Sequence, residues 1–196
     1  MSKLHWGKPY VKLHEYLALL PVTIVVEPKI EADDAIGYIA KQILDKQAVI
    51  MSSDKDFLQL VNDRISVWSP TKKKLYTPQL IQEEYGLPSQ NFIWYRVFDG
   101  DKSDNIPGIK GAGLKSIKKY LPFMLEEQEI DIDTIYEFID NTDKSYKIYT
   151  ELKGNRDIVE RNYKLMQLLD VDISGTTKLS IADRVKHAIT PLNNFT

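Results

Sequence analysis

Apolar residues follow two different spacings along the first half of the chain. Short runs rich in β-branched and other apolar residues at 22–27, 48–51 and 65–68 are typical of strands buried in a sheet. Residues 31–44 and 54–61 instead carry apolar side chains at helical spacing. Strands that alternate with helices over short connections favour a mainly parallel sheet with flanking helices. The first half of the chain therefore predicts an α/β architecture.

From residue 77 onward the pattern predicts helices. Thr77-Pro78 is typical of a helix start, and Gly86 of a helix end. A short amphipathic helix is also expected at 11–20, whereas 170–196 has weak periodicity. Further helices are expected at residues 88–98, 114–121, 131–141, 144–152 and 156–169. We expect one compact body, with a partial α/β core at residues 1–76 and a helical region at residues 77–196.

Composition narrows the class of protein. The 196 residues include 43% hydrophobic and 28% charged side chains and no cysteine, which excludes a disulfide framework and thiolate metal sites. No apolar run approaches the ~18 residues that a membrane span needs, and the start lacks the apolar core of a secretory signal. A cytoplasmic protein without a membrane partner is therefore expected. The net charge of −2 would become +2 with two bound divalent cations, which is compatible with a polyanionic substrate.

Carboxylates gather in three clusters, of which the first two follow predicted strands. Each cluster alone has a structural explanation, because acidic residues stabilise helix N-termini and Asp54 is a good N-cap. In an open α/β sheet, however, the loops at the carboxyl ends of the strands line one crevice. We therefore expect the first two clusters to meet. Their members are Glu31, Asp33 and Asp34, then Asp54 and Asp56, then Asp101 and Asp104.

So many neighbouring carboxylates require neutralisation, because like charges raise each other's proton affinity. The three histidines are distant in sequence, and oxygen-only sites favour Mg²⁺ or Mn²⁺ over Zn²⁺. The set suits a two-metal site for phosphodiester hydrolysis. An EF-hand starting at Asp99 is a poor alternative, since Asp104 and Lys110 stand where that loop needs glycine and glutamate.

A glycine-rich turn follows the third cluster and leads into a lysine-bearing helix. Glycines let backbone approach a ligand closely, and lysines at spacings of three and four residues share a helix face. Together they indicate a helix–hairpin–helix that binds duplex phosphates without reading bases. The alternative is an ordinary turn with a solvated lysine face, which is also the preferred interpretation of Lys72–Lys74. The candidate DNA-binding residues are Gly108, Lys110, Gly111, Gly113, Lys115, Lys118 and Lys119.

The segments Glu31–Asp34, Ser53–Leu60 and Gly100–Gly113 resemble, in this order, successive motifs of the 5′-nuclease or flap endonuclease family. That family includes the 5′→3′ exonuclease domain of bacterial DNA polymerase I and phage ribonuclease H. The resemblance implies a PIN-like nuclease core, a helix–three-turn–helix element, and metal-dependent hydrolysis at 5′ ends or flaps of duplex DNA or RNA–DNA. It also implies a role in DNA replication, in the host cytoplasm if the protein is phage-encoded.

The resemblance also assigns roles to residues. It implies two Mg²⁺ or Mn²⁺ ions, and a duplex-binding hairpin at residues 108–113 that in this family often holds a K⁺ ion. Glu31, Asp33 and Asp34 would chiefly serve the first metal, and Asp54, Asp56, Asp101 and Asp104 the second. These seven carboxylates are the candidate catalytic residues.

The start of the chain departs from the family pattern. Family members carry an N-terminal strand ending in Asp-Gly, a second aspartate and a basic helical arch, whereas residues 1–30 contain no aspartate. We therefore expect a sheet without its first strand and a separate N-terminal nuclease fragment as partner. The competing hypothesis is a catalytically deficient duplex-DNA-binding module. A PIN-like ribonuclease would share the acidic centre but would not explain the glycine hairpin.

Overall fold

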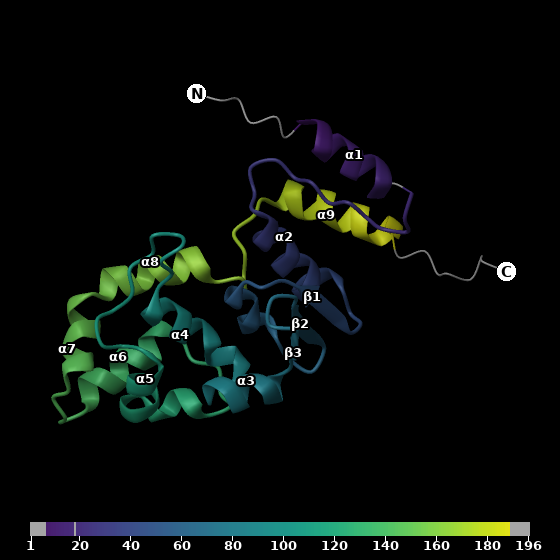
Figure 1. The fold of residues 1–196 in the computed structure, drawn as a ribbon. Coiled ribbons are helices and arrows are strands. Elements are labelled where there is room, and N and C mark those ends of the chain that lie inside the picture. Colours follow the sequence, from purple (N-terminus) through teal and green to yellow (C-terminus); the bar gives the residue numbers. More distant parts are fainter. Residues whose placement is uncertain (1–6, 18, 189–196) are drawn as a thin grey trace. The chain divides into compact units, whose positions relative to one another are not determined.

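The computed structural model describes residues 7–17 and 19–188 of the chain (Figure 1). These residues divide into two compact units, one built from residues 32–172 and the other from the described parts of 1–31 and 173–196. No helix within the described ranges is long and apolar enough to cross a bilayer.

The larger unit contains a three-stranded sheet of β1 (Ala48–Met51), β2 (Ile65–Ser69) and β3 (Lys74–Tyr76), in that order. β1 and β2 run parallel, which confirms the predicted pair, and β3 runs antiparallel to β2. β3 is not among the predicted strands. The lysine-rich turn before it closes a β-hairpin, in which Lys73 has a φ of 53°.

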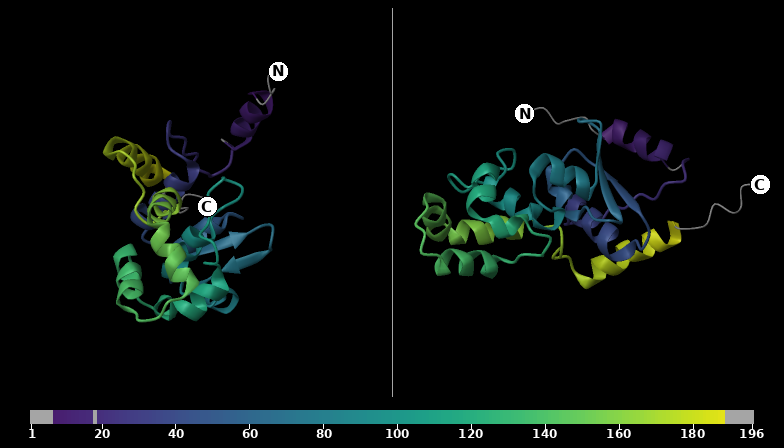
Figure 2. Two further views of the ribbon diagram at one scale, coloured as in Figure 1. Left: turned by 90° about the vertical axis from the view of Figure 1, so that its left-hand side faces the viewer. Right: turned by 90° about the horizontal axis from the view of Figure 1, so that it is seen from below.

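One face of this sheet is largely uncovered. Val49 and Met51 of β1 are 62% and 73% exposed, and Leu75 of β3 is 44% exposed. Met51 is paired with Trp68, and Trp68 with Leu75, so these three side chains lie on the same face. The opposite face carries Ile50, Ile65 and Val67, which are at most 7% exposed, and Figure 2 shows helices of the larger unit close to the strands. β1 is also an edge strand, because no strand of the described residues pairs with its outer side.

Helices make up most of the rest of the larger unit. α3 has the two ends expected from the sequence: Thr77 accepts a hydrogen bond from the backbone N of Leu80 at 3.3 Å, and Gly86 takes the left-handed φ of 61°. The helical elements are α2 (Ala32–Tyr38), η1 (Ile39–Ile43), η2 (Lys55–Leu60), α3 (Pro78–Tyr85), η3 (Ser89–Asn91), α4 (Phe92–Asp99), α5 (Leu114–Tyr120), η4 (Pro122–Leu125), α6 (Ile132–Asn141), α7 (Lys147–Gly154) and α8 (Arg156–Met166).

These helices confirm the predicted helical half from residue 77 to residue 169. The element after β1 differs from its prediction. It is the short 3₁₀-helix η2, which ends where Val61 returns to extended backbone. Gln59 of η2 exchanges side-chain hydrogen bonds of 2.9 Å with the backbone of Met166 and Leu168. These hydrogen bonds hold η2, a 3₁₀-helix of six residues, against the end of α8.

α4 forms the centre of the core. Phe92, Trp94 and Phe98 are at most 2% exposed, and the Trp94 ring stacks on Tyr163 of α8 with centroids 4.8 Å apart. Burying such rings contributes roughly 2 to 3 kcal/mol each. The same helix carries Arg96, which is only 4% exposed. A rigid, buried helix therefore fixes the position of one buried guanidinium.

The smaller unit consists of α1 (Gly7–Leu17), an extended segment and α9 (Gly175–Ala188). The predicted strand at 22–27 is wrong: the segment is extended but has no strand partner in the described residues, and Val22 and Val26 are 49% and 53% exposed. Its last residue, Glu27, instead accepts a 2.7 Å hydrogen bond from Ser180 of α9.

The helix predicted at 11–20 is confirmed as α1, with an earlier start and end, and its residue 18 lies outside the described ranges. α9 is not among the predicted helices, because Ile181 and Val185 are the only buried residues among its described side chains. The expected functional division at residue 76 stays a prediction. The compact units have different bounds, since residues 32–172 hold both the sheet and α3 to α8.

Candidate metal and nucleic-acid site

The Arg96 guanidinium joins two of the three acidic clusters. Its Nε lies 2.6 Å from Oδ1 of Asp56, and its Nη2 lies 2.6 Å from Oδ2 of Asp101. Its Nη1 also reaches the carbonyl oxygen of Gly100 at 3.5 Å. The two aspartates are 45 residues apart in sequence, and one side chain of α4 brings them together.

Local backbone structure sets the position of each aspartate. Asp54 is the N-cap of η2, and its Oδ1 accepts a 2.8 Å hydrogen bond from the backbone N of Asp56. Asp56 is therefore held in the first turn of η2, directly after β1. Asp101 exchanges two backbone hydrogen bonds with Ile106, of 2.9 and 2.7 Å, and its Oδ1 accepts from the backbone N and the hydroxyl of Ser103. The turn after α4 is thus closed around Asp101.

The two carboxyl groups differ electrostatically. Burial raises the pKa of Asp56, with smaller contributions from the charges of Asp54 and Asp101, even though Arg96 acts in the opposite direction. Hydrogen bonds, first from the Ser103 hydroxyl and then from Arg96, lower the pKa of Asp101 to about 2. Asp101 is therefore a firmly ionised carboxylate, and Asp56 is the member of the pair that most needs a neighbouring cation.

The remaining predicted carboxylates are more dispersed. Asp33 and Asp34 lie half-buried in the first turn of α2, and Asp104 is exposed in the turn after Asp101. Glu31 is exposed and belongs to the smaller unit. Within residues 7–17 and 19–188, no three acidic or histidine side chains are placed to hold one metal ion. The structure thus brings Asp56 and Asp101 together, with Asp54 beside Asp56, but does not gather all seven carboxylates.

The central carboxylates nevertheless have the chemistry of a hard-cation site. Asp54, Asp56 and Asp101 offer only oxygen, and the charges of Asp54 and Asp101 both act on Asp56. Arg96 engages Asp56 through Oδ1 alone. A divalent cation at these residues would offset the repulsion from Asp54 and Asp101, which adds to the effect of burial in raising the pKa of Asp56. The residues present therefore supply the oxygen ligands that such an ion prefers, although within residues 7–17 and 19–188 no three of them are placed to hold one ion.

The glycines between residues 100 and 113 have two different structural roles. A Cβ on Gly100 would collide with the backbone of Ile106 and Gly108, and a Cβ on Gly108 would collide with the carbonyl of Asp99. These two glycines are needed because the backbone packs against itself. Gly111, in contrast, has a φ of 79° and open space beside it, as has Gly113, where φ is negative.

α5 presents its lysines to solvent. Ile117 and Leu121 are buried on one side, and Lys115, Lys118 and Lys119 are exposed, as is Lys110 in the preceding turn. The Lys118 side chain extends over Gly86, and the Lys119 ammonium lies 5.0 Å from the centroid of the Tyr120 ring. The predicted lysine face therefore exists as an exposed surface beside the open glycines.

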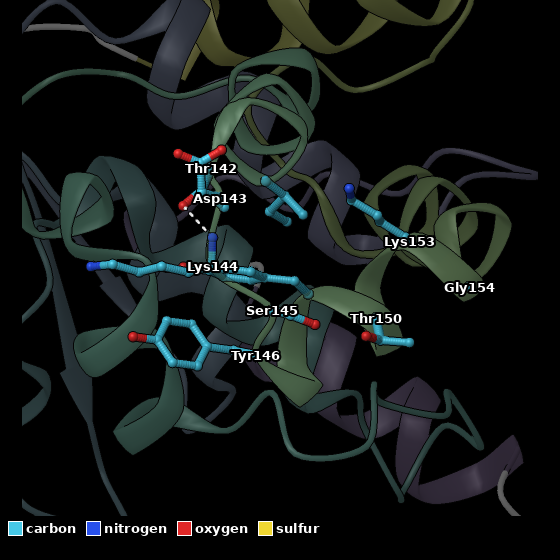
Figure 3. Close-up of a pocket in the computed structure, with 10 residues that line it drawn as sticks. Thr142, Asp143, Lys144, Ser145, Tyr146, Thr150, Lys153 and Gly154 are labelled. Carbon is cyan, nitrogen blue, oxygen red and sulfur yellow. Dashed lines mark hydrogen bonds between the residues drawn. The ribbon is translucent and has the colours of Figure 1, made fainter.

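A cavity of about 580 Å³ lies elsewhere, between the end of α6 and α7 (Figure 3). Its lining includes Thr142, Lys144, Tyr146 and Lys153, and none of the predicted site residues. Lys153 is paired with Asp140 at 2.7 Å. The cavity is wide and shallow, and its residues do not form an acidic constellation.

Sequence reasoning did not identify Arg96. A signal was present, because Arg96 is the only basic residue in the aromatic segment that forms α4. A charge on a helix that is otherwise buried requires an ionic partner. The nearest acidic cluster begins a few residues later, at the end of the same helix.

Comparison with known proteins shows that the chain is similar to 5′-3′ exonucleases and to DNA polymerase I. Residues 8–86 match the family model described as the 5′-3′ exonuclease, N-terminal resolvase-like domain. A 5′-3′ exonuclease of Buchnera aphidicola is 34% identical over 170 residues, covering 82% of this chain and 57% of the relative. A DNA polymerase I of Mycobacterium bovis is 32% identical over 170 residues, covering 83% of this chain and 18% of that protein. The chain thus spans little more than half of the exonuclease relative.

The fold is that of a 5′-nuclease. The bacteriophage T5 flap endonuclease, solved in a complex with DNA and metal ions, superposes with a TM-score of 0.74 over 93% of this chain and 68% of that one. The sequence identity is 22%, so the likeness concerns the fold alone. The expected α/β nuclease core with flanking helices is confirmed, and the matching family model describes its domain as resolvase-like.

Proposed function

The chain belongs to the 5′-3′ exonuclease family, and we therefore propose that it forms the body of a divalent-metal-dependent 5′ nuclease. Its reaction is hydrolysis of phosphodiesters at 5′ ends or flaps of duplex DNA or RNA–DNA. The observation that carries this proposal is the acidic centre in which Arg96 joins Asp56 and Asp101.

The proposed cofactor is a pair of Mg²⁺ or Mn²⁺ ions. The oxygen-only chemistry of Asp54, Asp56 and Asp101 supports one of them, and a structural relative was solved with divalent metal ions bound. When bound, such ions activate water and stabilise charge at phosphorus. Asp104, with Asp33, Asp34 and Glu31, remains part of the proposed ligand set. A K⁺ ion at residues 108–113 is a further proposal.

The proposed nucleic-acid contact is the turn and helix from Lys110 to Lys119. Open backbone at Gly111 and Gly113 lets a phosphate approach, and Lys115, Lys118 and Lys119 supply positive charge. Such contacts hold duplex DNA by its phosphates without reading its bases. A nuclease with this substrate works in the cytoplasm, or in the host cytoplasm if a phage encodes it.

We also propose a separate N-terminal nuclease fragment as partner. The uncovered apolar face of Val49, Met51 and Leu75, together with the unpaired edge of β1, supports this proposal. An added strand and its covering helix would bury these side chains and pair the free backbone groups of β1.

Cleavage of a labelled 5′-flap duplex tests the proposed activity. The chain is incubated in Mg²⁺ with and without a separately expressed N-terminal fragment, and with EDTA in parallel. We expect short 5′ products that disappear in EDTA and in Asp101→Asn. Lack of cleavage in every mixture would overturn the enzymatic proposal.

A second candidate function is duplex binding without cleavage. It is favoured by the lack, within the described residues, of a group of three acidic side chains placed for a metal. Under this hypothesis Asp101→Asn leaves duplex affinity unchanged and no mixture cleaves the flap. Cleavage by the wild type would exclude it.

A further inference from the structure

Arg96 is a buried charge with two acidic partners, and nothing in the family assignment gives it a role. Its side chain is 5% exposed, whereas those of Asp56 and Asp101 are 17% and 20% exposed. The Arg96 side chain is therefore the least exposed of the three, and both carboxylates are partly open to solvent. A cation arriving from solvent can therefore reach the carboxylates.

The hydrogen bonds leave the two aspartates unequally free. A carboxylate offers about four acceptor positions. Asp101 already accepts from Arg96 through Oδ2 and from the backbone and hydroxyl of Ser103 through Oδ1. Asp56 accepts from Arg96 through Oδ1. Arg96 thus fixes both side chains while most acceptor positions of Asp56 stay open.

The shape of the guanidinium suits this task. Its planar fork spans two carboxylates in a fixed orientation, and it stays charged at any pH the protein meets. α4, which carries it, is anchored by the buried Trp94 and by the aromatic stack on Tyr163. The position of Arg96 is therefore set by the core rather than by the aspartates.

We propose that Arg96 is a positioning residue for the divalent-cation site: it holds one oxygen of Asp56 and one of Asp101, and keeps this contact when the cation binds. This role rests on the proposed metal-dependent function. Partners that orient metal ligands typically change metal affinity by about 10- to 100-fold when they are replaced. Arg96 acts through the aspartates and is not itself a ligand.

Titration with Mn²⁺, followed by the electron paramagnetic resonance of the free ion, tests the proposal without reference to activity. Arg96→Lys keeps the charge but loses the planar fork. We expect Mn²⁺ to bind Arg96→Lys about 10- to 100-fold more weakly than the wild type. Arg64→Lys is the matched control, because Arg64 donates to the backbone carbonyls of Leu44 and Lys46 and has no carboxylate partner among the described residues. Its Mn²⁺ affinity should equal that of the wild type.

A second measurement uses the wild-type protein and does not depend on the folding of a variant. The chain has five arginines, so ¹⁵N-arginine labelling gives few Nε–H signals. The Arg96 signal, assigned by its loss in Arg96→Lys or by its shift in Asp56→Asn, should stay protected from solvent exchange when Mg²⁺ is added. Loss of that protection would mean that the ion displaces Arg96, which would overturn the positioning role.

The outcomes separate the two proposals. Equal Mn²⁺ affinity of Arg96→Lys and the wild type overturns the role of Arg96 and leaves the metal site intact. If the wild type binds Mn²⁺ no better than the double variant Asp56→Asn/Asp101→Asn, the metal site itself is refuted, and the role of Arg96 with it. Both the metal site and the role of Arg96 are supported if Arg96→Lys binds Mn²⁺ weakly, Arg64→Lys binds it like the wild type, and the Arg96 Nε–H signal stays protected in Mg²⁺.

Discussion

Asn162 of α8 donates a 2.8 Å hydrogen bond from its Nδ2 to the carbonyl of Pro107 at the start of the hairpin. The same nitrogen also lies 3.1 Å from the carbonyl of Val97, one of the last carbonyls of α4, which lack helical partners. Asn162 is completely buried. One amide therefore fixes the hairpin relative to the helix that carries Arg96.

Replacing Asn162 by alanine should destabilise the protein markedly. The buried carbonyl of Val97 loses its donor, and an unsatisfied buried group costs about 1 to 3 kcal/mol, so we expect the free energy of unfolding to fall by about that amount. The carbonyl of Pro107, at a more exposed position, also loses a hydrogen bond. Urea unfolding measures the loss. Asn155→Ala is the control, since half-buried Asn155 donates only to Glu151 within its own region. A loss no larger than that of the control would contradict the buried role of Asn162.

The hairpin glycines should separate folding from binding. Gly108→Ala places a Cβ against the backbone carbonyls of Asp99 and Phe98, which cannot move aside cheaply, so we expect a large drop in the urea midpoint. Gly113→Ala meets open space at a negative φ and should leave the midpoint unchanged or slightly higher. If Gly113 contacts the duplex, as proposed, this variant should bind a DNA duplex more weakly. Unchanged binding would remove Gly113 from the proposed interface.

The lysine face of α5 should govern the salt dependence of duplex binding. Replacing Lys115, Lys118 and Lys119 together by alanine removes up to three phosphate contacts, each of which contributes a slope of about 0.9 in log K against log salt. Fluorescence anisotropy at several salt concentrations measures this slope. We expect weaker binding and a slope smaller by up to about 3.

The control for this experiment removes three exposed lysines from other helices or turns, namely Lys144, Lys147 and Lys164. Net charge changes equally in the two triple variants. An identical loss of affinity in both would show that overall charge, rather than the α5 surface, drives association, and the hairpin assignment would then be rejected.

The sequence predicted the features that local chemistry decides. Thr77 and Gly86 gave the ends of α3 because a side-chain cap and a left-handed glycine act within one helix turn. The strand predicted at 22–27 is wrong because a strand needs a neighbouring strand as hydrogen-bond partner, and the described residues provide none. α9 could not be predicted from the sequence because two buried residues, Ile181 and Val185, give too weak an apolar periodicity.

The candidate site was predictable to a similar extent. Asp54 is the N-cap that its sequence position indicated, and Asp56 and Asp101 do lie together. Their joining through Arg96 could not be derived from spacing, because it depends on how α4 is oriented in the core. Whether Asp33, Asp34 and Asp104 share the same ion stays a prediction, as does the role of Glu31.

Glu84 should contribute to acid sensitivity. A hydrogen bond from Lys74 is the main cause that lowers the pKa of Glu84, with a second hydrogen bond of 3.1 Å from the Tyr76 hydroxyl. A lowered folded-state pKa means that Glu84 stabilises the fold above the ordinary glutamate pKa and loses this contribution as pH falls through the lower folded value. Glu84→Gln should therefore narrow the difference between urea midpoints at about pH 6 and pH 3. Glu83→Gln, on the same helix, is the control, and an equal effect of both would contradict the assignment.

The uncovered sheet face should matter for the partner and not for the fold. Val49 and Met51 are 62% and 73% exposed, so Val49→Ser with Met51→Ser should change stability by no more than about 1 kcal/mol. If an N-terminal fragment covers this face, the double variant should no longer gain flap cleavage when the fragment is added. Leu165→Ser is a matched control, because Leu165 of α8 is 63% exposed and lies outside the sheet. If the fragment still stimulates flap cleavage by the double variant, the fragment binds elsewhere. If the double variant loses this stimulation and Leu165→Ser keeps it, the fragment binds the β1 face.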